Sequence, residues 1–370
     1  MRYYLIAGEA SGDLHGSNLI RGLKSEDPDA EFRFWGGDMM AEAAGGQAPV
    51  VHYRGGAVMG ITDILAKSRQ LLGNLDRCKQ DILGWRPDVV IPIDYPGFNL
   101  KVAGFCHDRG IKVYYYIAPK TWASRESRNA LIKERVDKLF IIFPFEVPYF
   151  KEKGIDAVYA GNPLVDAVDS HQYTRPSEDG YVALLAGSRK SEIQRMMPVC
   201  MEVAGKLGLK VLVAGAPSAS MDDYAPFIEG RDNVEVLFGR TYDILRFADA
   251  AIINSGTASL EAALIGTPQV VCWSTNPLTA FVGYKIFRIF DHIKYISLGN
   301  LCLGRLAFKE LVQKDFTAEN VETELQRLCS DADYRSRMKA DYAEIRRLLG
   351  GAGASEAVAR AMVDNLKKAI

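Results

Sequence analysis

The sequence predicts an α/β protein that is built from two doubly wound parallel sheets. Its 370 residues exceed what one ordinary hydrophobic core accommodates, so two domains of roughly 150–200 residues each are expected. Short apolar runs alternate with longer helical stretches along most of the chain. The runs are continuously apolar rather than alternating, which is typical of strands in parallel sheets whose two faces are both covered by helices.

The expected strands form two series, one in each half of the chain. The first series is Tyr3–Ala7, Glu31–Trp35, Val89–Asp94, Lys112–Ile117 and Leu139–Phe143. The second series is Tyr181–Ala186, Lys210–Ala214, Val234–Phe238, Ala250–Asn254 and Gln269–Trp273. Two such series favour two Rossmann-like domains, whose ligands bind beyond the carboxyl ends of the strands.

The sequence also suggests where the domains begin and end. A first domain over 1–164 ends at Gly161–Leu164, and a polar stretch then leads into a second domain over 165–345. After about residue 315 the pattern is helical. The glycine-rich break Gly350–Gly353 precedes a last helix within 346–370, which we expect to pack back on the first domain or on a partner chain.

Composition excludes several classes of function. The 45 basic and 46 acidic residues nearly cancel, so no overall charge favours nucleic acid as a partner. No apolar run reaches the roughly 18 residues of a membrane-spanning helix. The six cysteines are scattered without a CxxC pair, which indicates reduced thiols in a cytoplasmic protein. The five histidines are unpaired, and we expect neither a metal nor a cofactor.

The first expected strand is followed by a turn that contains Gly8, Glu9, Ser11 and Gly12. Its glycines allow close backbone approach, and the free N–H groups of the helix that follows attract anions. The spacing is neither a GxGxxG fingerprint nor a GxxxxGK[ST] phosphate loop. The alternative is an ordinary tight turn in which Ser11 or Asp13 caps the helix.

Asp94 ends the third expected strand, before the Tyr95–Asn99 turn. A carboxylate at the carboxyl edge of a sheet is placed to act as a general base toward a substrate hydroxyl. The alternative is a helix cap, which is the commoner role of an aspartate after a strand.

Two turns in the second half combine features of a diphosphate site. Gly187-Ser188-Arg189 follows a strand and supplies a guanidinium that binds phosphate in a bidentate manner. Ser255-Gly256-Thr257 follows another strand and offers backbone N–H groups at a helix start. Glu261 lies one turn further along, where it either binds two vicinal ribose hydroxyls or merely complements the helix dipole.

Taken together, these turns resemble the lipid-A-disaccharide synthase family, bacterial glycosyltransferases of the GT-B type. Seven stretches carry the resemblance: Ala7–Asp13 (AGEASGD), Ala57–Ile61 (AVMGI), Ile93–Asn99 (IDYPGFN), Ala118–Trp122 (APKTW), Leu184–Ile193 (LLAGSRKSEI), Ser255–Glu261 (SGTASLE) and Ser297–Gln313 (SLGNLCLGRLAFKELVQ). They span nearly the whole chain in family order. The resemblance implies two Rossmann-like domains that face each other across a cleft.

The resemblance also implies a reaction and the residues for it. The family joins UDP-2,3-diacylglucosamine to 2,3-diacylglucosamine 1-phosphate, with inversion at the anomeric carbon and release of UDP. By position, Asp94 corresponds to the proposed catalytic base and Asn300 to an asparagine that is needed for activity. The residues that correspond to UDP-binding elements are Arg189, Ser255–Thr257 and Glu261, and those of the cleft-facing glycine-rich loop are Glu9 and Ser11.

The sequence departs from the family pattern at four positions, although none of them removes a proposed catalytic group. Ser124 stands where an aromatic residue usually continues the Trp122 motif, and Ala186 replaces a proline before Gly187. Asn162 stands where a Gly-His pair is common, and Gly299 replaces a proline before Asn300.

Lipid substrates imply peripheral association with the inner-membrane surface from the cytoplasm, and a homodimer is one expected assembly. Two stretches combine apolar and basic residues at helical spacing. The first contains Ile61, Ile64, Leu65, Leu71, Leu72 and Leu75, with Lys67, Arg69 and Arg77. The second is Phe281–Lys294. For either stretch the alternative is a helix that packs on the core.

Two rival functions fit the same architecture. A UDP-N-acetylglucosamine 2-epimerase would need an additional acid/base set around the sugar, and the sequence shows none. A non-catalytic nucleotide-sugar binder has no use for Asp94.

Overall fold

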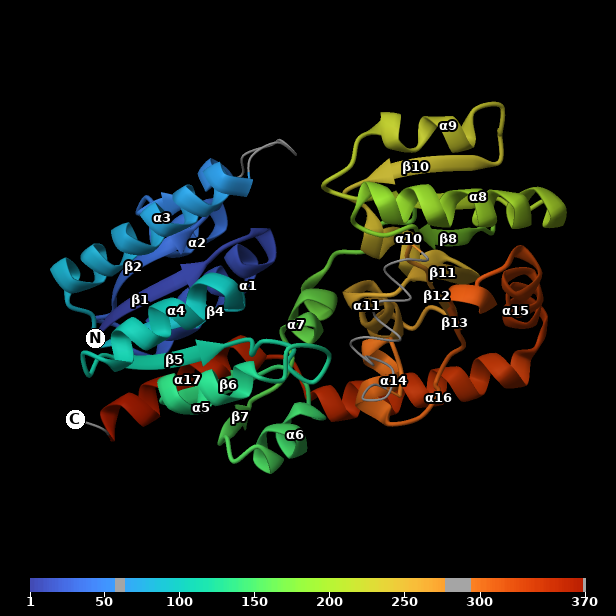
Figure 1. The fold of residues 1–370 in the computed structure, drawn as a ribbon. Coiled ribbons are helices and arrows are strands. Elements are labelled where there is room, and N and C mark those ends of the chain that lie inside the picture. The colour runs from blue at the N-terminus through green and yellow to red at the C-terminus, as the bar shows by residue number, and fades with distance from the viewer. Residues whose placement is uncertain (57–63, 277–293, 369–370) are drawn as a thin grey trace. The chain divides into compact units, whose positions relative to one another are not determined.

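The structure is a computed structural model that describes residues 1–56, 64–276 and 294–368. The chain divides into two compact units (Figure 1). The first comprises residues 1–166 together with 350–370, and the second comprises 167–349. Each unit is described by itself below.

The first unit contains a seven-stranded sheet in the order β3-β2-β1-β4-β5-β6-β7, in which every pairing is parallel. Its strands are β1 (Arg2–Ala7), β2 (Glu31–Gly36), β3 (Val51–His52), β4 (Val89–Ile93), β5 (Lys112–Tyr116), β6 (Lys138–Ile141) and β7 (Ala157–Tyr159). Its helices are α1 (Ala10–Glu26), α2 (Asp38–Ala43), α3 (Ile64–Trp85), α4 (Pro96–His107), α5 (Arg128–Arg135), α6 (Glu146–Glu152), the start of α7 (Pro163–Ser170) and α17 (Ala354–Lys367).

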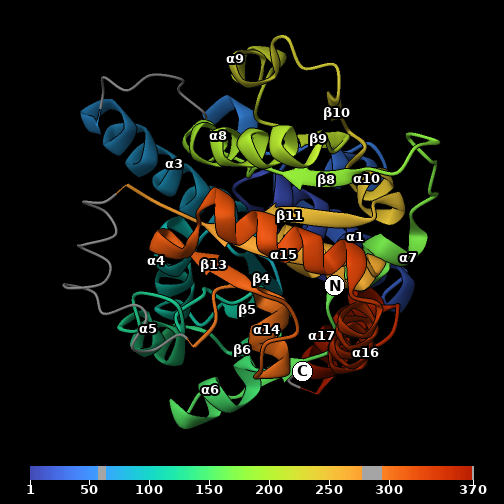
Figure 2. The same cartoon turned by 90° about the vertical axis from the view of Figure 1, so that its right-hand side faces the viewer.

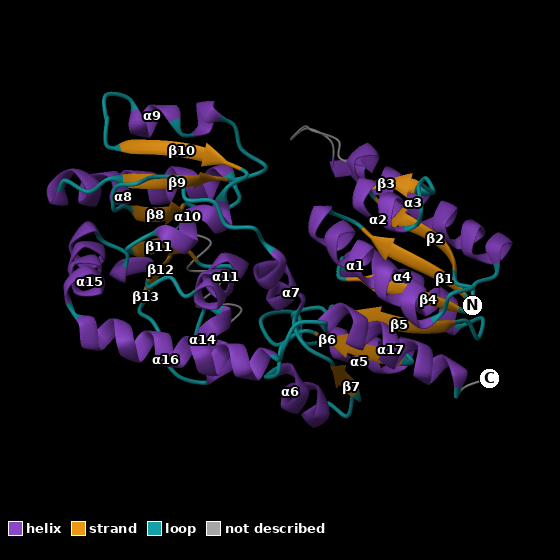
Figure 3. Cartoon of the chain, turned by 180° about the vertical axis from the view of Figure 1, so that it is seen from behind, coloured by secondary structure: helices purple, strands orange, loops and turns teal. Residues whose placement is uncertain are grey.

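Strand β1 shows why the run from Tyr3 to Ala7 contains no charged residue. Tyr3 and Leu5 face a core that α1 and α17 complete, whereas Tyr4 and Ile6 face a core that α3 and α4 complete. Because successive side chains point to opposite faces, a strand with helices on both sides has no polar face (Figure 3).

Helix α17 belongs to the first unit although it is the last helix of the chain. Its apolar face, which includes Ala359 and Met362, joins the core beside α1. The helices approach closely at Gly22, where an added Cβ would lie 2.9 Å from the Cβ of Ala359. The Asp166 carboxylate accepts hydrogen bonds from the backbone N–H groups of residues 353–355 and so caps the helix N-terminus.

The second unit contains a six-stranded parallel sheet in the order β10-β9-β8-β11-β12-β13. Its strands are β8 (Val182–Leu185), β9 (Val211–Gly215), β10 (Val234–Phe238), β11 (Ala250–Asn254), β12 (Gln269–Trp273) and β13 (Glu310–Val312). Its helices include α8 (Lys190–Leu207), α9 (Ala225–Ile228), α10 (Thr241–Phe247), α11 (Thr257–Ile265), α14 (Leu298–Leu303), α15 (Ala318–Ser330) and α16 (Ala332–Leu349). Helix α8 packs beside α15 (Figure 2). Helix α11 packs beside α10, α14 and α16.

The two sheets share one topology, and the predicted fold class is confirmed. In each sheet the first six strands follow the Rossmann order 3-2-1-4-5-6, with one further strand at the edge of the first sheet. All ten predicted strands are present, and the sequence analysis missed only β3, β7 and β13 among the described strands. The order reverses between β1 and β4 and between β8 and β11. These are the positions where open α/β sheets bind ligands.

The amphipathic stretch along α3 packs partly on the core. Leu75 is buried and Leu71 packs against the same core cluster, whereas Leu72 is 56% exposed. The side chains of residues 61–69 lie outside the described part, as does the second stretch up to residue 293. No helix in the described ranges is both long and apolar enough to span a bilayer.

Candidate active site

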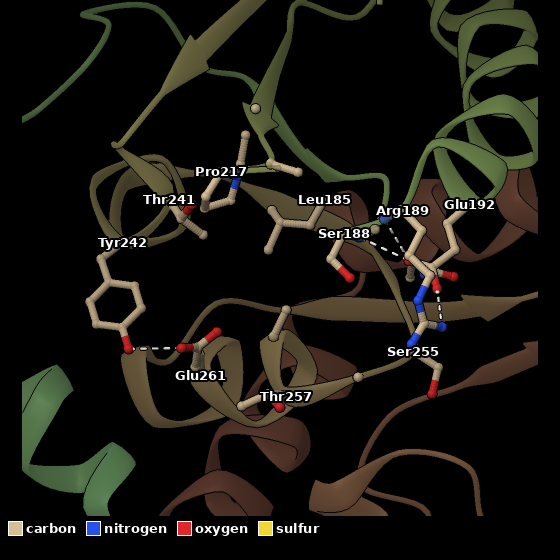
Figure 4. Close-up of a pocket in the computed structure, with 17 residues that line it drawn as sticks. Leu185, Ser188, Arg189, Glu192, Pro217, Thr241, Tyr242, Ser255, Thr257 and Glu261 are labelled. Atoms are coloured by element: carbon tan, nitrogen blue, oxygen red, sulfur yellow. Dashed lines mark hydrogen bonds and ion pairs between the residues drawn. The ribbon is translucent and has the colours of Figure 1, made fainter. Parts of the chain in front are cut away.

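The second sheet carries a cavity of about 550 Å³ at the carboxyl ends of β8 and β11 (Figure 4). A volume of this size is typical of small-molecule sites. Seven residues that the sequence analysis selected line it together: Gly187, Ser188, Arg189, Ser255, Gly256, Thr257 and Glu261. The structure thus brings residues more than 60 positions apart in the sequence into one site.

The β8–α8 turn forms one wall of the cavity. Gly187 has φ 110°, a conformation that L side chains rarely adopt, and it allows the chain to enter α8 directly. The Glu192 carboxylate accepts hydrogen bonds from the backbone N–H groups of Ser188 (2.8 Å) and Arg189 (3.2 Å). It also accepts one from Arg189 Nη1 at 3.2 Å, although the Arg189 side chain is 79% exposed. An exposed guanidinium beside a helix N-terminus is suited to an anionic ligand.

The β11–α11 turn forms the opposite wall. Ser255 is held by its backbone and by its side chain. Its N–H donates to the Cys272 carbonyl (2.9 Å), and its hydroxyl donates to the Ile296 carbonyl (3.1 Å). This leaves Gly256 and Thr257 at the helix start, facing the cavity. The dipole of α11 therefore adds to that of α8 in favouring negative charge there.

Glu261 lies deeper in the same wall, where burial raises its pKa. The Tyr242 hydroxyl donates a 2.8 Å hydrogen bond to the Glu261 carboxylate (Figure 4). The carboxylate keeps further acceptor capacity toward the cavity, which suits a ligand that donates hydroxyl groups.

Sequence reasoning missed several residues of this site, notably Glu192, Thr241 and Tyr242. Glu192 stands three residues after Arg189, but an arginine side chain has no acceptor atom, so this spacing is not the capping-box signature and gave no usable signal. Tyr242 lies on α10, and nothing in its own sequence surroundings indicates that it contacts Glu261.

In the first sheet, Asp94 stands at the corresponding switch point, immediately after β4. Both Asp94 (φ 44°) and Tyr95 (φ 47°) adopt the left-handed conformation, which is costly for residues with a side chain. The Asp94 carbonyl is held by the Tyr115 hydroxyl (2.6 Å) and by the Asn99 amide (2.8 Å). These contacts fix the backbone, so the aspartate projects from a rigid turn and is not the helix cap of the alternative interpretation.

Charged groups from neighbouring elements act on the half-buried Asp94. Burial raises the pKa of its carboxyl, and the charge of Glu9 raises it further. The positive charges of Lys120 and Arg128 lower it. Asp94 therefore combines a raised pKa with nearby cations, a combination that suits a general base.

The predicted glycine-rich turn lies beside Asp94, since Ala7 pairs with Ile93 across β1 and β4. Gly8 is required there, because an added Cβ would lie 2.5 Å from the Tyr95 ring. Ser11 donates a 2.8 Å hydrogen bond to the exposed Glu9 carboxylate. Gly12 is buried at the start of α1, close to the Cβ of Ala7.

Asp13, the last residue of that motif, supports the turn. Its buried carboxylate accepts hydrogen bonds from the backbone N–H groups of Gly37 (2.7 Å), Met39 (3.2 Å) and Met40 (3.1 Å). It therefore fastens α1 to the start of α2 instead of facing a ligand.

Comparison with known proteins supports the resemblance to the lipid-A-disaccharide synthase family. The chain matches the sequence model of the lipid-A-disaccharide synthetase family over residues 3–362. This chain belongs to the lipid-A-disaccharide synthetase family. It is similar to the lipid-A-disaccharide synthase of Geobacter metallireducens, with 36% identity over 99% of this chain and 98% of the relative. It is also similar to that of Trichlorobacter lovleyi, with 34% identity over 97% and 96% of the two chains.

Solved structures support the GT-B fold of this family member. A UDP-N-acetylglucosamine 2-epimerase from Listeria monocytogenes superposes with a TM-score of 0.70 at 14% identity, over 100% of this chain and 97% of that one. A calicheamicin glycosyltransferase superposes with a TM-score of 0.58 at 16% identity, over 100% and 99%. At such identities the likeness concerns the fold alone.

Two positions that the sequence resemblance selects, Asn300 and Asn162, form hydrogen bonds within the second and the first unit respectively. Asn300 is fully buried and does not line the cavity. Its amide donates to the Phe308 carbonyl (3.1 Å) and to Glu310 (2.8 Å), and its oxygen accepts from the Ala307 N–H (2.8 Å). Asn162, one of the departures, begins α7 by accepting a 2.9 Å hydrogen bond from the Leu164 N–H.

No group of three or more His, Cys, Asp or Glu side chains that would hold a metal ion occurs among the residues with described placement.

Proposed function

We propose that this chain joins UDP-2,3-diacylglucosamine to 2,3-diacylglucosamine 1-phosphate and releases UDP, with inversion at the anomeric carbon. The observation that carries the proposal is the family match over residues 3–362. Two further observations support it: a cavity with anion-binding turns in the second unit, and a half-buried carboxyl on a rigid turn in the first.

In the proposed reaction, Asp94 accepts the proton of the acceptor hydroxyl as that oxygen attacks the anomeric carbon of the donor. The bond from that carbon to the UDP oxygen breaks, and UDP leaves with the electron pair. The raised pKa of Asp94 supports its role, because a stronger base accepts a hydroxyl proton more readily.

We assign the donor's UDP to the cavity of the second unit. Arg189 and the N-termini of α8 and α11 would bind the diphosphate and stabilise the charge that develops on it. Glu261 would accept hydrogen bonds from the ribose hydroxyls. Asn300 would act indirectly, by holding the turn that precedes β13.

The test is a UDP-release assay with the diacylated donor, with and without the phosphorylated acceptor. The proposal expects UDP only when both substrates are present, together with a disaccharide product. Conversion of UDP-N-acetylglucosamine into its manno epimer would instead identify an epimerase. Tight donor binding without any turnover would identify a non-catalytic binder.

We also place the chain at the inner-membrane surface, because both proposed substrates carry acyl chains. Leu72 on α3 is an exposed apolar side chain that is available for such contact. A homodimer remains a prediction.

A further inference from the structure

The Glu261 carboxylate has a single hydrogen-bond donor among the residues that the structure describes. The Tyr242 hydroxyl donates to Glu261 Oε1 at 2.8 Å, and both side chains line the cavity of the second unit (Figure 4). The two residues lie on different helices, since Tyr242 belongs to α10 and Glu261 to α11. The orientation of the carboxylate therefore depends on a residue 19 positions earlier in the sequence.

This hydrogen bond fixes Glu261 and leaves it free to bind a ligand. A glutamate side chain loses much rotamer freedom when it is held in one orientation. Because the Tyr242 hydroxyl already holds Oε1, a ligand that enters the cavity does not have to order the side chain itself. An ionised carboxylate has further acceptor positions on both oxygens, which remain for the hydroxyl groups of a ligand.

The Tyr242 ring is held in its turn by His171, the residue that directly follows α7. The two rings pack edge to face, with 5.2 Å between their centroids and an interplanar angle of 72°. His171 also packs edge to face on Tyr173 at 4.8 Å. Aromatic pairs prefer this geometry, so the neighbouring rings restrict the direction in which the Tyr242 hydroxyl points.

The buried Asp243 carboxylate fastens His171 to α10. It accepts hydrogen bonds from His171 Nε2 (3.1 Å), from the Thr174 backbone N–H (2.9 Å) and from Arg240 Nε (3.0 Å). Asp243 follows Tyr242 directly on the same helix. The segment after α7 is therefore tied to the turn of α10 that carries the tyrosine.

Other tyrosine hydroxyls of the second unit bind groups outside the cavity. Tyr181 donates to the Ile244 carbonyl at 2.9 Å. Tyr334 donates to the Glu324 carboxylate at 2.6 Å, and neither of these two residues lines the cavity. The hydroxyl of Tyr242 differs in its place, because its acceptor is a carboxylate in the cavity wall.

We propose that Tyr242 is a positioning residue for the donor nucleotide, whose hydroxyl holds Glu261 in the orientation that accepts hydrogen bonds from the ribose hydroxyls. This inference rests on the proposed function, which assigns UDP to the same cavity. It adds that recognition of the ribose depends on α10 and on the segment after α7, as well as on α11.

The test is a calorimetric titration of the full chain with UDP and with 2′,3′-dideoxy-UDP, which lacks both ribose hydroxyls. Tyr242→Phe keeps the ring and removes the hydroxyl. It should raise the Kd for UDP by about three- to tenfold, because Glu261 is no longer held, and leave the Kd for the dideoxy nucleotide unchanged. The matched control is Tyr181→Phe, which removes a hydroxyl bound to the same helix α10 and should keep both Kd values.

A double-mutant cycle with Glu261→Ala tests whether Tyr242 acts through the carboxylate. In the Glu261→Ala background, Tyr242→Phe should leave the ratio of the two Kd values unchanged. A merely structural role would weaken the binding of both nucleotides in both backgrounds, because a damaged cavity holds neither. In turnover, Tyr242→Phe should raise the KM for the donor and keep kcat, as expected for lost ground-state binding.

The inference is overturned if Tyr242→Phe changes both Kd values equally or changes neither, or if it alters their ratio when Glu261 is absent. A wild type that binds UDP no better than the dideoxy nucleotide also overturns it, because Glu261 then contributes nothing to ribose binding. A wild type that prefers UDP as expected but releases none from the diacylated donor overturns the proposed reaction instead. The role of Tyr242 in nucleotide binding is unaffected by that outcome.

Discussion

The two sheets share a strand order, yet different kinds of residue form the turns at their switch points. In the first unit, residues with side chains occupy left-handed backbone conformations at the sheet edge, namely Asp94, Tyr95 and Ile117 (φ 61°). In the second, Gly187 is the only cavity-lining residue among those described that has such a conformation. The first switch point thus tolerates strain of about 1–3 kcal/mol per residue, and the turns that line the cavity of the second unit avoid it; the left-handed Gln313 (φ 53°) follows β13, away from that cavity.

The difference follows from what each edge presents. In the first unit the left-handed turn holds the Asp94 carboxyl group at a fixed point, because two hydrogen bonds to the Asp94 carbonyl fix its backbone. In the second unit small residues form the turns, so that Gly256 and Thr257 face the cavity at the start of α11, whereas the N–H groups of Ser188 and Arg189 at α8 already donate to the Glu192 carboxylate. Side-chain substitutions in the first unit should therefore change turnover, whereas those in the second should change nucleotide affinity.

The largest effect is expected for Asp94→Asn, which keeps the shape of the side chain but removes the base. We expect kcat to fall by about 10²–10⁴-fold, the usual contribution of general base catalysis. The Kd for UDP, measured by titration calorimetry, should stay at the wild-type value. Wild-type turnover in this variant would remove the aspartate from the mechanism.

Glu146→Gln tests whether burial of the Glu146 carboxylate lowers the stability of the first unit. Burial raises the pKa of Glu146 to about 7, so the folded protein binds a proton more tightly than the unfolded chain does. The wild type should therefore lose stability relative to the variant as the pH rises from about 4.5 to about 7, by up to about 3 kcal/mol. Urea unfolding at several pH values measures this. A difference that is constant with pH would contradict the raised pKa.

Arg189→Ala tests the second edge. We expect the Kd for UDP to rise by about 10–100-fold, the range for a lost charged hydrogen bond. The control is Lys206→Ala, which removes a cation at the far end of the same helix. An unchanged Kd for Arg189→Ala would argue against its assignment to the diphosphate.

The smallest effect is expected for a pair of glycine substitutions. Gly187→Ala places a Cβ 2.5 Å from Glu192 in an unfavourable conformation, and should cost about 1–3 kcal/mol of stability. Gly256→Ala is the matched control, because its backbone is extended and no atom lies within 4 Å of the added Cβ. Equal melting temperatures for the two variants would show that the turn at Gly187 adapts.

The sequence predicted the structure best at buried strands, because burial restricts which residue types can occur there. Apolar runs predicted ten of the described strands, because a strand covered on both faces has few polar positions, whereas β10 lies at an edge of its sheet and exposes Glu235. Strands β3, β7 and β13 have only two or three residues each and are mostly half-buried, so pairing with a neighbour defines them rather than their composition.

The candidate site likewise contains residues that the sequence predicted and residues that it did not. The turns directly after β8 and β11 predicted six residues of the cavity, and Glu261, one helical turn further along, is the seventh, since parallel strand ends converge at one edge. The contact between Tyr242 and Glu261 depends on how α10 packs against α11, which no local pattern encodes. Asn300 was selected from the resemblance alone, and its buried hydrogen bonds concern the fold around it.

The return of α17 to the first unit has a consequence for biosynthesis. The core around Leu19 and Leu23 is completed by residues of α17, which the ribosome adds only after the whole second unit has been made. Until then an apolar surface of α1 stays uncovered on the nascent chain. Deleting α17 would therefore destabilise the first unit, although most of that unit lies far from α17 in the sequence. The second unit, which directly precedes α17 in the sequence, would stay folded.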